Sequence, residues 1–333
     1  MPITKLSDPG DFEKINRAWS LLLRKSEIDS VFLTHEWFYA WWNCFSADYH
    51  LEMLLFTDQK GTLKGIAPFK IKGDQISFIA NHEVTDYCDF IAEKENKETF
   101  FREILSYIKK NHSRLKKIDL INIPSKSDTL SILSSLAREY GFSVSKELSE
   151  VVPILILPDS IDSYLFELKR KNRHELRRKI KRIEKLPGLS LRRIKDSEEI
   201  KKYIKSFIRL HELSHEEKNI FWQKRNMCSF FENIVRLFSL NEWSELLLLY
   251  QNEQLIAGLL TFDYHNTIYL YNTAYSPDYA WYSPGIYLFY DVIISAIRDK
   301  KKKVDFLRGQ ENYKFFFQAK ESTIHNLVLI PGE

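Results

Sequence analysis

The strongest constraint on the fold of this chain is a pattern of elements that its sequence carries twice. The segment SELLLLYQNEQLIAGLLTF, residues 244–262, aligns without a gap on LEMLLFTDQKGTLKGIAPF, residues 51–69, at an offset of 193 positions. The alignment sets Gly65 opposite Gly258 and keeps the apolar runs on either side of a turn in step. Each segment therefore predicts two antiparallel strands joined by a short turn.

The repeated pattern continues beyond the two hairpins. In each half a further strand and a helix follow, and then a short strand, KKIDLIN in the first half and KKVDFLR in the second, which sets Asp119 opposite Asp305. Chance produces a few identities among apolar strands, but it does not readily reproduce the order strand, turn, strand, strand, helix, strand. We interpret the repeat as an internal duplication.

The length of the chain and its prolines indicate where one domain ends and the next begins. A chain of 333 residues exceeds one typical domain. Pro153 and Pro158 bracket a short apolar segment, so we expect domains at 1–150 and 151–333. Both are predicted to be α/β (α+β) domains, each a mixed, mostly antiparallel sheet flanked by helices.

Hydrophobic periodicity predicts the individual elements. Apolar residues at helical spacing predict helices at residues 11–26, 34–45, 97–110, 128–140, 160–185, 197–213 and 227–239, and one that begins at Pro284. Shorter β-rich runs predict strands at residues 51–57, 63–71, 75–80, 87–92 and 117–123 in the first half.

Composition narrows the class of protein. The net charge of +4 is below what a dedicated nucleic-acid binder carries, and no apolar run approaches the roughly 20 residues of a membrane span. The first residues lack the apolar core of a signal peptide, and three widely spaced cysteines fit a reducing compartment. His211 and His215 lack the HExxH arrangement. We therefore expect a cytoplasmic protein with no metal site.

The segment around residue 283 is a candidate anion site. Ser283 can cap a helix, Pro284 suits its first turn, and Gly285 allows close approach of a ligand. The first N–H groups of a helix and its dipole favour phosphate. The alternative is an ordinary helix cap, since nearly every helix has such an end.

A dense cluster of polar residues follows the strand that contains Asp305. That carboxylate lies in an apolar run and needs a partner, either in chemistry or in a structural hydrogen bond. After it, Arg308 suits recognition of a carboxylate or phosphate, Glu311 could accept a proton from an amine, and Tyr313 could donate one to a leaving group. Lys314 would orient the donor or the acceptor. This cluster is the best candidate site in the sequence.

Three further features are weaker candidates for binding. Trp42 is expected to point away from the apolar stripe of its helix, where it could meet a ligand or the other domain. Asp86 could bind an acceptor or form a turn. The helix at residues 165–185 carries ten Lys or Arg. It is first an amphipathic packing helix with a solvated face, and alternatively a surface for phosphates, acidic glycans or a membrane.

Four motifs together resemble the CelD-like, Fem-related acetyltransferases of the GNAT superfamily. They are FLTHEWFYAWW, KNRHELRRKIKRIEK, YNTAYSPDYAWYSPGIYL and VDFLRGQENYKFFF. The resemblance implies two GNAT-like domains in tandem, the first degenerate or acceptor-shaping and the second catalytic. It also implies transfer of an acyl group, acetyl first, from acyl-CoA to an amine of a sugar, polysaccharide or cell-envelope precursor.

The chain departs from the wider family at the donor site. The glycine-rich pyrophosphate loop is reduced to Tyr282, Ser283, Pro284 and Gly285, with Tyr275 as a further donor-binding residue. Two other functions therefore stay open. One is a Fem-like aminoacyl transfer from aminoacyl-tRNA, and the other is a binding module without catalysis that uses the basic helix. Peripheral contact with a membrane is compatible with each of them.

Overall fold

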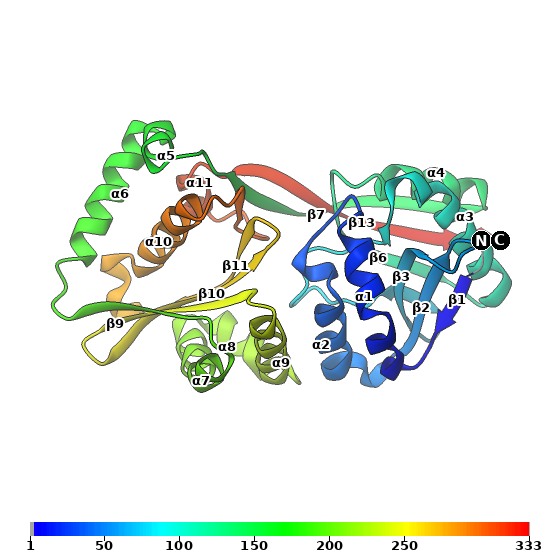
Figure 1. Ribbon diagram of the computed structural model, residues 1–333, viewed down its shortest axis with the longest axis horizontal. Coiled ribbons are helices and arrows are strands. Elements are labelled where there is room, and N and C mark those ends of the chain that lie inside the picture. The colour runs from blue at the N-terminus through cyan, green and yellow to red at the C-terminus, as the bar shows by residue number, and fades with distance from the viewer. Residues whose placement is uncertain (1–2, 333) are drawn as a thin grey trace. The chain divides into compact units, whose positions relative to one another are not determined.

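The computed structural model describes residues 3–332, and the chain divides into two compact units (Figure 1). One unit holds the chain up to Glu150 together with the residues from Thr323 onward, and the other holds Val151–Ser322. The sequence predicted a second domain that runs on to residue 333. The extent differs because β13 (Lys320–Pro331) pairs antiparallel with β6 (Lys117–Pro124) of the first unit.

The first unit is built on a mixed sheet. Its strand order is β1-β2-β3-β4-β6-β13, with β5 paired to β3, and only the β4–β6 pair among the pairs described is parallel. Helices α3 and α4 pack together against this sheet around a core rich in phenylalanine, while α1 packs on α2. The elements are β1 (Ile3–Leu6), α1 (Phe12–Leu23), α2 (His35–Phe45), β2 (His50–Thr57), β3 (Leu63–Lys72), β4 (Gln75–Phe78), β5 (Ile91–Ala92), α3 (Lys97–Asn111) and α4 (Thr129–Glu139).

The second unit repeats this plan. Its strand order is β7-β12-β11-β10-β9-β8, with β7 belonging to this unit only from Val151 onward, and the β11–β12 pair is parallel. Helix α10 covers one face of the sheet with α5 and α6 outside it, and α7, α8 and α9 cover the other face (Figure 1). The elements are β7 (Phe142–Ile156), α5 (Ile161–Glu167), α6 (Arg170–Ile183), β8 (Leu189–Ile194), α7 (Ser197–Ser214), α8 (Glu216–Gln223), α9 (Met227–Leu240), β9 (Ser244–Gln251), β10 (Gln254–Tyr264), β11 (Thr267–Tyr275), α10 (Pro284–Arg298), β12 (Lys303–Asp305) and α11 (Asn312–Phe316).

Each of the two aligned glycines lies under an aromatic ring. A Cβ on Gly65 would lie 2.6 Å from the ring of Phe100, and a Cβ on Gly258 would lie 2.7 Å from the ring of Phe207. Each glycine therefore lets an aromatic ring from a covering helix lie directly on the second strand of the hairpin. The covering helices are not equivalent, because Phe100 is on α3, which corresponds to α10 in the repeat, and Phe207 is on α7 on the other face of its sheet. The repeated element order gives the tandem α/β fold that the sequence predicted.

The prediction of one long basic helix at residues 160–185 is wrong, because the segment forms two helices. The backbone is extended at Leu168 and Lys169, with ψ values of 132° and 134°, so that α5 ends and α6 begins there. Leu168 is buried in the core of the second unit. Packing of this leucine outweighs the helix propensity of the residues around it.

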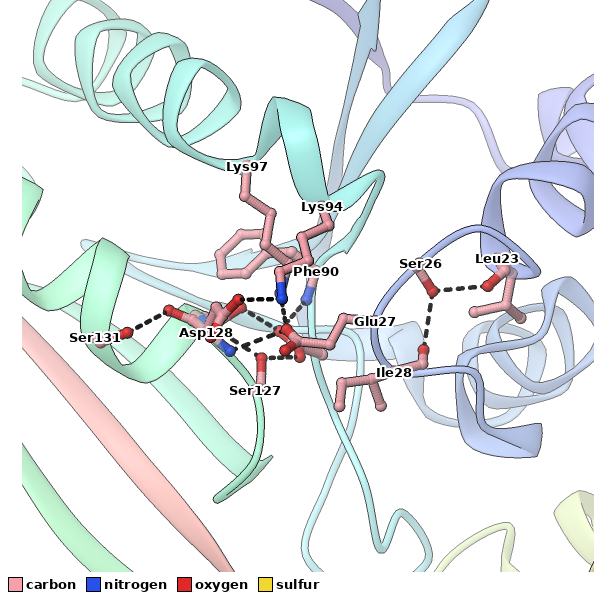
Figure 2. A network of polar contacts seen from close by, with 12 residues as sticks. Leu23, Ser26, Glu27, Ile28, Phe90, Lys94, Lys97, Ser127, Asp128 and Ser131 are labelled. Atoms are coloured by element: carbon pink, nitrogen blue, oxygen red, sulfur yellow. Dashed lines mark hydrogen bonds and ion pairs between the residues drawn. The ribbon is translucent and has the colours of Figure 1, made fainter.

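A buried polar network joins separate segments of the first unit (Figure 2). The Nζ atom of Lys97, at the start of α3, lies 2.6 Å from the Glu27 carboxylate, which also accepts from the N–H of Asp128 at 2.9 Å. Lys97 is almost fully buried. The pair therefore ties the loop after α1 to the first turns of α3 and α4, and loss of one partner would leave a buried charge unpaired.

Candidate active site

A strand edge lies in the second unit where two parallel strands part. Among the described residues, β12 pairs with β11 only over Thr267–Tyr269. Beyond Tyr269, β11 continues to Tyr275 and pairs with β10 on its other side. From Thr273 to Tyr275, β11 therefore presents an edge toward the side from which β12 has ended, where backbone groups can meet a ligand.

The first turn of α10 has two cations beside it. Ser283 occupies the N-cap position with left-handed backbone angles, φ 55° and ψ 52°, and its side chain makes no cap hydrogen bond. Instead, its Oγ accepts from Lys179 Nζ at 2.9 Å and from Arg182 Nη2 at 3.5 Å. The expected side-chain cap is therefore wrong, because the Ser283 hydroxyl faces the cations of α6.

Arg182 is held over an aromatic ring. Its guanidinium carbon lies 4.2 Å from the ring centre of Trp281, and its buried Nε has no hydrogen-bond partner. A buried N–H without a partner costs free energy that an acceptor would recover. Arg182 and Lys179, on one side of α6, thus converge on the N-terminus of a 15-residue helix, a position that favours an anion.

Gly285 lies between this anion-binding end and the free edge of β11. A Cβ at this position would lie 3.8 Å from Thr273 Cγ2 and 3.9 Å from Tyr275 Cδ1. The structure therefore brings Ser283, Pro284, Gly285 and Tyr275 together. All four were predicted as donor-binding residues.

The loop after β12 is shaped by two of the predicted catalytic residues. Asp305 is buried, and its Oδ1 accepts from the N–H of Leu307 at 2.9 Å, where Leu307 has a φ of 58°. Lys314 is also buried and donates to the carbonyl oxygens of Leu307 at 3.3 Å and of Arg308. These contacts fix the backbone of the loop, so Asp305 has the structural partner that the sequence left as an alternative.

Glu311 and Tyr313 differ from these loop-fixing residues. Glu311 receives one ion pair, from Lys314 Nζ at 2.9 Å, and its side chain is 53% exposed, which leaves it open to a substrate. Tyr313 stacks on Phe289 with ring centres 5.2 Å apart. Burial raises the pKa of Tyr313, and the neighbouring Glu311 and Tyr275 add to the effect. The phenol therefore keeps its proton, so it can donate a hydrogen bond.

The sequence analysis missed a half-buried lysine on the other face of the sheet. Lys218, on α8, donates from Nζ to the carbonyl oxygen of Thr273 at 2.6 Å, on the free stretch of β11. Burial lowers the pKa of Lys218 to about 8, and the nearby Glu311 carboxylate opposes that shift. No sequence signal marked Lys218, because α8 itself was not predicted.

The two histidines at helical spacing have separate structural roles. His211 is buried, and its Nδ1 accepts from the indole N–H of Trp222 at 2.9 Å. Burial, and then the charge of Lys218, lower the pKa of His211 to about 3. His215 caps α8 through a bond from the N–H of Glu217. Within residues 3–332, no group of three or more His, Cys, Asp or Glu is arranged to hold a metal ion.

The two acceptor candidates of the first unit are both buried. Trp42 is 6% exposed, and its ring centre lies 6.4 Å from that of Trp41. Asp86 is 7% exposed. Its neighbour Asp89 accepts from Ser127 Oγ at 2.5 Å and from Thr129 Oγ1 at 2.7 Å, so it holds the start of α4. A role of Trp42 and Asp86 in acceptor binding stays a prediction.

Comparison with known families identifies the domain that carries this site. Residues 170–315 match the family described as "Acetyltransferase (GNAT) domain". The match begins at α6 and ends in α11, so it includes the anion-binding end of α10, the free edge of β11 and the loop after β12. No curated protein sequence matches the chain.

Solved structures share the fold of the whole chain. FemX superposes with a TM-score of 0.67 at 14% sequence identity, over 98% of this chain and 97% of that one. L-PGS from Bacillus licheniformis gives 0.59 at 11% identity, over 99% and 94%. A tandem GNAT protein from the clavulanic acid biosynthesis pathway gives 0.53 at 7% identity, over 98% and 97%. The likeness to these three is one of fold. No helix within the described residues has the length and apolarity needed to cross a bilayer.

Proposed function

We propose that the chain is an acyltransferase of the GNAT superfamily that transfers an acyl group, acetyl first, from acyl-CoA to an amine; the match of residues 170–315 to the GNAT acetyltransferase domain supports this proposal. The proposed acceptor is an amine of a sugar, polysaccharide or cell-envelope precursor. The observation that carries the proposal is the convergence of Lys179 and Arg182 on the first turn of α10, beside the free edge of β11.

The donor's diphosphate fits this end of α10. A diphosphate needs N–H donors and positive charge; the first turn supplies unpaired backbone N–H groups, while Lys179 and Arg182 supply charge. The Arg182 Nε that has no partner would gain an acceptor. The side chains of α6 thereby make up for the glycine-rich loop that the sequence lacks. The edge of β11 from Thr273 to Tyr275 offers backbone groups to the amides of the donor's arm.

Different residues of the second unit can carry the separate steps of the reaction. The acceptor nitrogen attacks the thioester carbonyl, a C–N bond forms, the C–S bond breaks, and the amine proton goes to the Glu311 carboxylate. Tyr313 keeps its proton and donates a hydrogen bond to the departing sulfur. Arg308 binds the acceptor. Backbone N–H groups between Tyr271 and Tyr275 stabilise the oxyanion.

Asp305 and Lys314 serve this scheme as positioning residues. Both act on the backbone between Leu307 and Gly309, which carries Glu311 and Tyr313 into place. Holding two reactants in a fixed geometry can contribute on the order of 7 to 11 kcal/mol to such a reaction.

A second function is favoured by one specific observation. FemX is the match of highest TM-score among the three compared, and it covers nearly the full length of both chains. Aminoacyl-tRNA is therefore the alternative donor, in line with what the Fem-related resemblance implies. The acid–base chemistry of Glu311 would be unchanged, since an ester replaces the thioester.

Donor binding can be tested with two matched pairs of substitutions on one helix. Acetyl-CoA should raise the thermal midpoint of the wild type, because it binds only the folded state. K179A/R182A should lower acetyl-CoA affinity by at least about tenfold, since two charge-assisted phosphate contacts are lost. R177A/K181A, on the exposed side of α6, should leave affinity unchanged. Equal loss in both pairs, or no shift with any acyl-CoA, would overturn the donor assignment, and a shift with aminoacyl-tRNA would support the alternative.

Catalysis can be tested by thiol release from acetyl-CoA with a panel of amino sugars and amines. E311Q should reduce release by about 10²- to 10⁴-fold while acetyl-CoA still binds, because only proton transfer is affected. E253Q, in the turn between β9 and β10, is the matched control and should retain full release. Unchanged turnover in folded E311Q protein would remove Glu311 from the role of base.

A further inference from the structure

The exposed side of α6 presents a continuous band of positive charge. The band consists of the five exposed cations of the helix, Arg170, Lys171, Arg177, Arg178 and Lys181. At about 100° per residue they span an arc of about 120° around the helix axis. We call this arc the outer face of α6. The one carboxylate of α6, Glu175, lies outside the arc and pairs with Arg178 at 2.7 Å.

The outer face is not used for packing within its own unit. Leu176 and Ile183 form the buried side of α6, and α6 packs on α10, which in turn covers the sheet (Figure 1). Lys179 and Arg182 point toward the first turn of α10 and belong to the site described above. The helix therefore has three sides: one in the core, one at the active site and one toward solvent.

A large apolar side chain stands beside this band of charge. Phe166, at the end of α5, is 82% exposed, and it precedes three consecutive cations, Lys169, Arg170 and Lys171. Arg173, in the first turn of α6, donates to the carbonyl oxygens of Leu165 and Phe166 at 3.0 and 3.3 Å. The backbone at the end of α5, which carries Phe166, is thus tied to the first turn of α6, which carries Arg170 and Lys171.

We propose that the outer face of α6, together with Phe166, docks on an anionic phospholipid surface. A band of Lys and Arg beside an exposed aromatic ring is the pattern of helices that lie in the interface of anionic membranes, with the cations at the headgroups and the ring at the acyl boundary. The proposal does not depend on acyl transfer, because none of the outer-face residues belongs to the proposed active site.

A polynucleotide is the competing partner for such a face, and the aromatic residues argue against it. Cations attract the phosphates of RNA as well as those of lipids. Sequence-tolerant binding of single strands adds bases stacked on open aromatic faces. Trp281, the other large exposed aromatic near α6, has a ring face covered by the Arg182 guanidinium at 4.2 Å, while Phe166 is exposed over most of its surface. That arrangement suits insertion into lipid better than stacking of bases.

The test is flotation of the full chain with vesicles at 150 mM salt. The protein should float with vesicles of three parts phosphatidylcholine to one part phosphatidylglycerol and should not float with pure phosphatidylcholine. Each outer-face cation removed should weaken partition by about fivefold, so R170Q/K171Q/R177Q/K181Q should lose vesicle binding by at least about a hundredfold. At high salt the electrostatic attraction is screened and the apolar contribution remains, so F166S should partition onto the vesicles more weakly than the wild type under that condition.

Control variants keep the result specific to this face. K179Q/R182Q removes two cations of the same helix from its inner side and should retain at least a fifth of wild-type partition. The quadruple variant should keep its thermal midpoint, since all four side chains are exposed. Equal flotation with pure phosphatidylcholine, or unchanged partition of the quadruple variant, would overturn the proposal. So would a short RNA that binds more tightly than the anionic vesicles and loses binding in the same variant.

Discussion

A single residue, Asp305, shows how the same backbone requirement is met differently in the two units. Leu307 has a φ of 58°, and its N–H is held by Asp305 at 2.9 Å. In the first unit Asn122 has a φ of 55°, and its N–H is held by Asn326 Oδ1 at 3.0 Å. Asn122 lies two residues before the end of β6 and Leu307 two residues after the end of β12, and each is a left-handed residue whose N–H has a side-chain acceptor. A carboxylate in an apolar strand is therefore as typical of a residue that holds a left-handed turn as of a catalytic base.

Two substitutions of Asp305 separate these roles. Asp305→Asn keeps an oxygen acceptor for the Leu307 N–H and should retain the fold and most of the thiol-release activity. Asp305→Ala removes the acceptor and should lower the free energy of unfolding by about 1 to 3 kcal/mol. Chemical denaturation and thiol release measure the two quantities. A folded Asn variant without activity would instead identify Asp305 as the base.

His211 gives the protein a sensitivity to acid. The unfolded chain binds a proton at this histidine near pH 6.5, whereas burial delays protonation in the folded state to about pH 3. Between these values the unfolded state holds more protons, so stability is complete above pH 6.5 and falls as the pH drops, by up to about 1.4 kcal/mol per pH unit.

The free energy of unfolding of wild type and H211N, measured between pH 4 and 7.5, should show the contribution of His211 to the acid sensitivity. Asparagine keeps an acceptor for the Trp222 N–H but does not titrate, so H211N should show a shallower loss of stability in acid. Identical slopes in the two proteins would mean that other groups set the acid sensitivity.

At the scale of elements, the gapless alignment is correct for the first strand of each hairpin and one residue off for the second. Leu54 pairs with Ala67 on the α3 side of the first sheet, and Leu247 pairs with Leu259 on the α10 side of the second. The first strands thus correspond at an offset of 193 and the second strands at 192. The turn in the first unit is longer, and β3 and β10 each contain a bulge near it. The sequence does not show such a shift in register, because in an apolar run every residue is compatible with a buried position.

The elements that sequence reasoning found share a local signal, and those it missed lack one. The helices α1, α2, α3, α4, α7 and α9 and the hairpin strands carry their own periodicity. The first half of β7 is largely exposed and polar, and β13 pairs with a partner about 200 residues away. Nothing in either segment specifies that partner. Likewise, the loop residues 305–314 could be proposed as a site from their own sequence, while Lys179, Arg182 and Lys218 come from helices that only the fold brings near.

Three glycines test the packing of these elements. Gly258→Ala and Gly65→Ala each place a methyl group within 2.7 Å of an aromatic ring and should destabilise the protein by about 1 to 3 kcal/mol. Gly285→Ala meets nothing closer than 3.8 Å and should stabilise α10 by about 0.5 to 1 kcal/mol. Thermal unfolding compares the three. A stable Gly258→Ala variant would show that Phe207 moves aside at little cost.

At the scale of the whole molecule, the two units do not follow the order of the chain. The first unit takes its β13 strand from residues that follow the entire second unit. Ile324, Leu327 and Leu329 of β13 are buried there. Because these side chains complete the core of the first unit, that unit depends on a segment far from the rest of its sequence.

Leu327→Ala should therefore weaken the first unit selectively. The substitution leaves a cavity in that core and should cost about 2 to 5 kcal/mol. Hydrogen exchange should show faster opening of peptides from β2, β3 and β6, with peptides from β9 and β10 unchanged. Ile330→Ala, at a position 48% exposed, is the control. Equal acceleration in both units would mean that they unfold as one.

The returning strand also sets an order of events during synthesis. Domains normally fold as the ribosome delivers them, the N-terminal one first. Here β13 lies between β6 and β7, and it leaves the ribosome only after every residue of the second unit. The second unit can close while the first still has a vacant place in its sheet. On the ribosome the half made first is the half completed last, and until then its exposed strand edges are the part of the nascent chain most in need of a chaperone.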